Sequence, residues 1–195
     1  EIFREKQNDL NVTYDSFNND TIEEINNLNK KFDFLVLEQQ FNDNKDYFLF
    51  LAKSLLTILK CQNNNGSCVI KISNMCYKPV VDFVYTLCSL YDKVYILKPN
   101  SNDITSFEKY IICKNYLHAP NVCNINCCNL LELIQNQSNN IINSFWNFNI
   151  PYYFLSKIDD INIIIGHQQI ESLNLIVNII KNKNRDERIE VLRKN

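Results

Sequence analysis

The chain has 195 residues, 46% of them hydrophobic, which is enough for one sizeable core or for an α/β domain with a helical appendage. Its 20 basic and 22 acidic residues nearly balance, which excludes a uniformly basic surface, so any contact with nucleic acid must be local. No signal peptide is visible and no apolar run reaches the ~18 residues that span a bilayer, so the sequence predicts a soluble, cytoplasmic protein without a membrane partner.

The eight cysteines contain no CxxC pair, which argues against a disulfide framework or a common zinc motif. Cys68, Cys88 and Cys113 lie inside apolar runs and are predicted to pack as reduced, small hydrophobes. The tightest cluster runs from His118 to Cys128 and matches no structural zinc spacing, so no metal site is predicted, with zinc kept as the minor alternative.

In chain order, residues 1–31 are polar, with a short β-like stretch at Asn11 to Tyr14 and a helix predicted from Thr21 to Leu28. The compact apolar run from Phe32 to Leu37 is typical of a strand buried on both faces of a parallel sheet.

Helical and strand patterns then alternate. Apolar residues recur at helical spacing from Asp46 to Lys60, and this helix is expected to end before a turn at Asn63 to Gly66. A strand is predicted from Ser67 to Ile72, and Pro79 opens the next helix.

Two more strands are predicted, at Lys93 to Leu97 and at Tyr110 to Lys114, joined by a polar loop from Lys98 to Phe107. The alternation of strands and helices predicts an α/β fold with a mostly parallel sheet. Because no helix separates the last two strands, they should form an antiparallel hairpin at the sheet edge.

The strands thin out after Asn115, and the sequence predicts a domain boundary near residue 117 followed by a helical extension over residues 118–195. Helices are expected at Leu130 to Ile134, Ile141 to Phe148 and Ile170 to Ile180, packed against the sheet domain.

Two charged residues, Lys71 and Glu108, are predicted to lie at one edge of this sheet, where α/β proteins place their active sites. Each has a plainer interpretation. Lys71 could be a strand-end lysine that extends its ammonium group to solvent, and Glu108 an exposed loop carboxylate.

Three segments occur in order: Gly66-Ser67-Cys68-Val69-Ile70-Lys71, then Leu97-Lys98-Pro99, then Ser106-Phe107-Glu108-Lys109-Tyr110. This set resembles the C-terminal part of FtsJ-like RNA 2′-O-methyltransferases, and the resemblance covers about residues 10 to 117. It is strongest to the cap-methylating members of large DNA viruses and eukaryotes. It implies a partial Rossmann-like methyltransferase sheet, S-adenosylmethionine as cofactor, capped mRNA rather than rRNA as substrate, a capping-machinery protein as a further partner, and the host cytoplasm or virion if the source is viral.

In this family a Lys-Asp-Lys-Glu tetrad surrounds the reacting ribose hydroxyl. The resemblance matches Lys71 to the central lysine and Glu108 to the final glutamate, with Glu38 standing where the family has aspartate. It also matches Asp15 to the acidic residue that meets the cofactor's adenine, although a turn aspartate is the plainer interpretation of that residue. With 2 glycines, the chain contains neither the family's glycine-rich cofactor loop nor the first tetrad lysine, which are either missing from the protein or located upstream of this sequence.

Two other functional classes stay open. One is a catalytically inactive methyltransferase-like module that binds RNA or a capping partner, because Glu38 replaces an aspartate. The other is an interaction protein that uses the aromatic stretch from Phe145 to Phe154, although core packing explains those aromatic residues better.

Overall fold

The computed structural model describes residues 31–99, 102–103, 105–117, 129–130 and 142–194, with side chains described as far as residue 183. The elements predicted before residue 31, Asp15, and the cluster from His118 to Cys128 lie outside these residues, as does most of the helix predicted at 130–134.

A four-stranded sheet has the order β1-β2-β4-β3. Its strands are β1 (Phe32–Leu37), β2 (Gln62–Ile72), β3 (Tyr91–Leu97) and β4 (Lys109–Tyr116). β1 and β2 are parallel, and β4 runs antiparallel to both β2 and β3. The predicted α/β fold is therefore confirmed, with a mostly parallel sheet and an antiparallel last strand. The β3–β4 hairpin lies at the sheet edge, and β3 is its outer strand.

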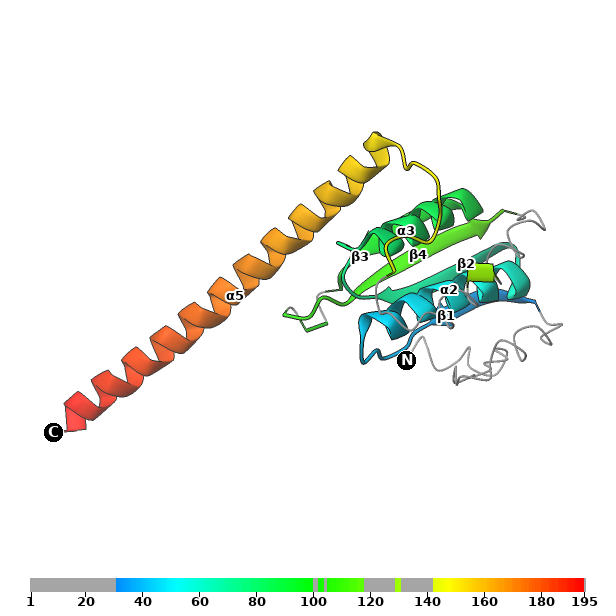
Figure 1. Ribbon diagram of the computed structural model, residues 1–195. Coiled ribbons are helices and arrows are strands. Elements are labelled where there is room, and N and C mark those ends of the chain that lie inside the picture. The colour runs from blue at the N-terminus through cyan, green and yellow to red at the C-terminus, as the bar shows by residue number, and fades with distance from the viewer. Residues whose placement is uncertain (1–30, 100–101, 104, 118–128, 131–141, 195) are drawn as a thin grey trace, which may run out of the picture.

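Two helices fill the connections, α2 (Asn44–Cys61) and α3 (Lys78–Leu90). The Asp43 side chain caps α2 by accepting a hydrogen bond from the Asp46 N–H at 2.8 Å. Pro79 occupies the first turn of α3, where its missing N–H costs nothing. Figure 1 shows both helices beside the sheet, and both contact it.

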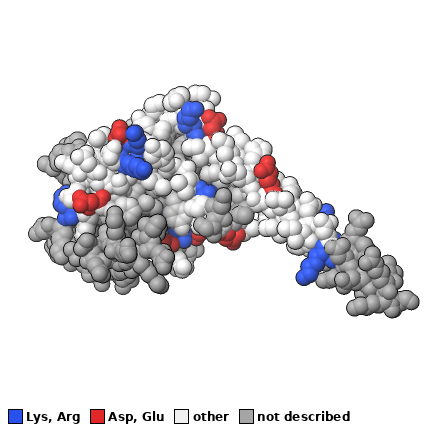
Figure 2. Space-filling model, turned by 180° about the vertical axis from the view of Figure 1, so that it is seen from behind, with Lys and Arg blue, Asp and Glu red and all other residues white. Residues whose placement is uncertain are grey.

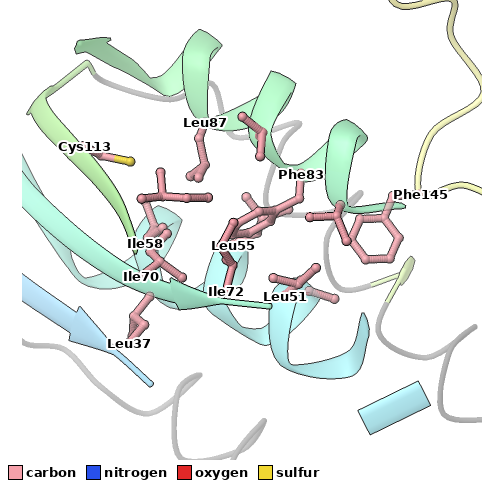
Figure 3. Packing of buried hydrophobic residues seen from close by; sticks show 14 of the residues in the cluster. Leu37, Leu51, Leu55, Ile58, Ile70, Ile72, Phe83, Leu87, Cys113 and Phe145 are labelled. Carbon is pink, nitrogen blue, oxygen red and sulfur yellow. The ribbon is translucent and has the colours of Figure 1, made fainter. Parts of the chain in front are cut away.

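The core lies between these helices and one face of the sheet (Figure 3). Alternate strand residues such as Ile70 and Ile111 are fully buried there, against Leu55 and Phe83 of the helices. Among the described residues, the opposite face is the more open one. Phe34 and Val36 of β1 are 57% and 62% exposed, so the prediction that this strand is buried on both faces is wrong. The physical reason is that α2 and α3 pack on the same face.

Local irregularity marks the start of β2. The predicted turn from Asn63 to Gly66 lies inside the strand, where the pairing with β1 shifts register. Asn65 adopts a left-handed conformation with φ of 62°, which asparagine tolerates better than most residues. The Gln62 side chain bridges the gap by donating to the backbone oxygen of Phe32 at 3.0 Å.

The cysteine predictions hold for two of three residues. Cys68 and Cys113 are buried opposite each other on β2 and β4. Cys88 is exposed, which corrects the prediction for that residue. Its neighbour Leu87 takes the buried position on α3, so Cys88 lies on the outer side of the helix.

The helix predicted from Ile141 to Phe148 is wrong over its described residues, 142–148, which contain no helix. Contacts with α3 account for this, because the Phe145 N–H donates at 2.9 Å to the carboxylate of Asp82 instead of to a helix carbonyl. The buried ring of Phe145 meets Phe48 edge to face, as core packing predicts.

The remaining residues form one long helix, α5 (Tyr152–Lys194), which includes the predicted helix at 170–180. Its first turns pack on the domain: Ile158 and Ile165 are buried, and Phe154 contacts Tyr85. Beyond them α5 extends away from the sheet (Figure 1), and its large apolar side chains from Ile170 to Ile180 are 42% to 66% exposed. The expectation that the whole tail packs against the sheet domain is therefore wrong.

The aromatic stretch from Phe145 to Phe154 also contains both buried and exposed residues. Phe145 is buried, whereas Tyr152 and Tyr153 are 84% and 74% exposed. Among the described residues, no helix has both the length and the apolar character needed to cross a bilayer.

Candidate functional site

The site is built around Lys71, the residue before the last in β2. Strand side chains alternate between faces, so Lys71 lies on the open face while its neighbours Ile70 and Ile72 enter the core. Its side chain is nevertheless only 16% exposed. A lysine covered to this extent needs acceptors for its ammonium group.

Glu38 supplies the first acceptor. It directly follows β1, and because β1 and β2 are parallel, their carboxyl ends lie at the same edge of the sheet. The Lys71 Nζ donates to Glu38 Oε1 at 2.7 Å. The extra methylene of glutamate relative to aspartate does not prevent this contact.

Glu108 supplies the second acceptor, from the residue before β4. Since β4 runs antiparallel to β2, its beginning lies beside the end of β2, where Lys71 pairs with Tyr110. The distance from Lys71 Nζ to Glu108 Oε1 is 3.0 Å. Lys71, Glu38 and Glu108 therefore converge as expected, and we call them the Lys71 cluster. Their catalytic roles stay a prediction.

The two carboxylates of the cluster stabilise the charged form of Lys71. The hydrogen bond to Glu38 raises the pKa of Lys71 most, and the bond to Glu108 adds to it, against the opposing effect of burial. Lys71 is therefore an ammonium ion at neutral pH. The Glu38 and Glu108 side chains are 53% and 44% exposed, so the cluster opens to solvent and is accessible to another molecule.

Two more lysines flank the cluster. Lys98 donates to the backbone oxygen of Ser106, and Lys109 donates to that of Phe107 at 3.1 Å. Lys109 is only 4% exposed, and burial, with a smaller contribution from nearby Lys98, lowers its pKa. Sequence reasoning missed its place in the core, although Lys109 shares the alternating pattern of the buried residues Ile111 and Cys113.

On the face of the molecule shown in Figure 2, the charged side chains of the described residues are scattered, with both signs intermixed and no broad basic field. Within the described residues, no group of histidine, cysteine and acidic side chains has the arrangement of a metal site.

Two curated relatives are similar in sequence to part of this chain, and both are called cap-specific mRNA (nucleoside-2′-O-)-methyltransferase 1. The Drosophila melanogaster protein is 31% identical over 142 residues, which are 69% of this chain and 18% of the relative. The Leishmania braziliensis protein is 25% identical over 127 residues, which are 63% of this chain and 32% of the relative. This chain resembles part of a cap-specific mRNA methyltransferase.

The similarity covers only part of each relative, because the chain spans less than a third of the length of either one. No family model matches it. Both relatives come from eukaryotes, so they lend no support to a viral source. The sheet fits this similarity, since its arrangement is that of a Rossmann-like α/β fold with an antiparallel last strand.

Proposed function

We propose that this chain is part of an FtsJ-like RNA 2′-O-methyltransferase that acts on capped mRNA, with Lys71 as its central catalytic lysine. The observation that carries the proposal is the position of Lys71 between Glu38 and Glu108, 2.7 and 3.0 Å away. The similarity to two cap-specific enzymes favours capped mRNA over rRNA. A cytoplasmic location and a capping-machinery partner are further parts of the proposal.

The proposed chemistry needs a cation at the reacting hydroxyl. A ribose 2′-hydroxyl is a weak nucleophile at neutral pH, and it loses its proton as its oxygen forms a bond to the methyl carbon. The Lys71 ammonium group would donate a hydrogen bond to this oxygen and stabilise the negative charge that develops on it. Because Lys71 is already protonated, it is better able to stabilise this negative charge than to accept the proton of the 2′-hydroxyl group. That proton would instead pass to water.

S-adenosylmethionine would supply the methyl group from its sulfonium centre. The described residues contain no glycine-rich turn. Gly66 is packed against Gln62 inside β2, and Gly166 lies within α5. Cofactor binding is therefore proposed for the whole protein, with Asp15 as the residue of this chain that contacts the adenine.

The test replaces Lys71 with alanine in the whole protein and measures methyl transfer to the 2′-hydroxyl of a capped RNA. We expect the rate constant to fall by roughly 10²- to 10³-fold, the usual loss when a donor to a developing oxyanion is removed. Cofactor affinity should stay unchanged. The control is Lys93→Ala, which removes an exposed lysine from β3 and should leave the rate unaltered.

Wild-type rates in Lys71→Ala would remove Lys71 from the mechanism. If the wild type itself transfers no methyl group, the inactive-module alternative gains, and Glu38→Asp tests whether the longer carboxylate is the reason.

A further inference from the structure

The backbone just before Glu108 is held by three side chains. The carbonyl oxygen of Ser106 accepts hydrogen bonds from Lys98 Nζ and, at 2.8 Å, from Gln169 Nε2. The next carbonyl, of Phe107, accepts from the buried Lys109. Two consecutive carbonyls thus receive three donors, two of them charged, and charge-assisted bonds are the stronger kind.

These donors come from separate elements. Lys98 directly follows β3, Lys109 begins β4, and Gln169 belongs to α5. In Figure 1 the helix passes the loop between β3 and β4 on its way out of the domain. Gln169 lies one turn beyond Ile165, the last buried apolar residue described in α5. Its bond to Ser106 therefore links the extended helix to the loop that carries Glu108.

We propose that Gln169 of α5, together with Lys98, is a positioning residue that holds the loop so that the Glu108 carboxylate reaches Lys71. Glu108 needs such support because its side chain is 44% exposed and lies at the end of a loop rather than within a strand. Without such support, an exposed carboxylate attracts a cation only weakly. Solvent screens the two charges, and holding the side chain in one conformation costs entropy. The proposal rests on the proposed function only for the catalytic importance of Glu108, because the coupling itself is a property of the fold.

The coupling can be measured without enzyme activity, through the reactivity of Lys71 toward an amine-selective acylating reagent at fixed pH. Gln169→Met keeps the length of the side chain but removes the donor, and Lys98→Met does the same on the other side of Ser106. Labelling of Lys71 is quantified by mass spectrometry relative to exposed Lys93 in the same chain. Gln168→Met, at the exposed neighbouring position, is the matched control.

Lys71 should be labelled faster in Gln169→Met than in the wild type, and roughly three- to tenfold faster in the double variant that combines Gln169→Met with Lys98→Met. The reason is that a fall of one unit in the pKa of Lys71 gives tenfold more free amine. Glu108→Gln sets the upper limit of this increase, and Gln168→Met should match the wild type. Unchanged labelling in the Gln169 and double variants, with the Glu108→Gln increase present, overturns the proposal. If Lys98→Met fails to fold, Gln169→Met decides alone.

Activity gives the second measurement. In the whole enzyme, Gln169→Met should lower kcat by about tenfold, since small displacements of catalytic groups are costly, and leave KM for capped RNA unchanged. A raised KM with unchanged kcat would instead mean that Gln169 acts in RNA binding. Should the wild type show no methyl transfer, the proposed function fails, while the labelling result still decides whether α5 positions Glu108.

Discussion

At the scale of single residues, the two glycines have opposite environments. A Cβ atom added to Gly66 would lie 2.1 Å from Nε2 of Gln62 and 2.9 Å from the backbone oxygens of Asn63 and Asp33. Gln62 is buried and already bonded to the backbone of β1, so it has little freedom to move. Gly66 is therefore required for close approach between β1 and β2, and its φ is not positive.

Gly66→Ala should lower the free energy of unfolding by about 1–3 kcal/mol, the usual cost of overpacking, measured by urea denaturation. Gly166→Ala is the matched control, because a Cβ there meets nothing within 4 Å. That substitution should instead stabilise α5 locally by up to about 1 kcal/mol, seen as slower amide exchange around residue 166. A neutral Gly66→Ala would show that Gln62 can yield after all.

At the scale of elements, one buried carboxylate attaches the segment before α5 to α3. Asp82 is fully buried and accepts hydrogen bonds from Ser144 Oγ at 2.6 Å and from the Phe145 N–H at 2.9 Å. Lys78, one turn earlier in α3, forms an ion pair with it at 3.2 Å. Trp146 adds a bond to Thr86 at 2.9 Å.

Asp82→Ala should lower the free energy of unfolding by about 3 kcal/mol, because it leaves the buried Phe145 N–H without an acceptor. Asp82→Asn keeps one acceptor oxygen and should cost less. Asp92→Ala, on the exposed side of β3, should stay within about 0.5 kcal/mol of the wild type. Equal losses for Asp82→Ala and Asp82→Asn would show that the charge of the carboxylate, rather than its bond to Phe145, carries the stabilisation.

At the scale of the whole molecule, α5 divides into a packed beginning and an extended remainder. Phe154 and Ile158 pack against the core, whereas the side chains from Ile170 to Ile180 are largely exposed. Stability of the α/β domain should therefore depend on the first turns of α5 only.

Removal of residues 173–195 should change the free energy of unfolding of the domain by less than about 0.5 kcal/mol, since the described side chains that it deletes, 173–183, are all exposed. Removal from residue 152 onward should cost about 2–4 kcal/mol, because it uncovers the core where Ile158 packs. Thermal unfolding followed by near-ultraviolet circular dichroism separates the two cases. A large loss in the shorter deletion would mean that the extended helix contributes to the domain.

The sequence was sufficient for the succession of the described strands along the chain and, through the family resemblance, for the cluster of Lys71, Glu38 and Glu108. Local periodicity determines whether a segment is a strand or a helix, and the carboxyl ends of neighbouring parallel strands must share one edge. Lys71 and Glu38 therefore had to be close once β1 and β2 were neighbours. Glu108 joined them because the final strand runs antiparallel.

Only the tertiary structure decided which surfaces are covered. A pattern of apolar residues records that a segment can be buried but not what lies on each side of it, so the open face of β1 and the exposed length of α5 were not foreseeable. The extended course of the segment around Phe145 depends on Asp82, 63 residues earlier. The bond from Gln169 to Ser106 likewise joins residues 63 apart, and no local pattern can specify such a contact, because it arises only when separate elements pack together.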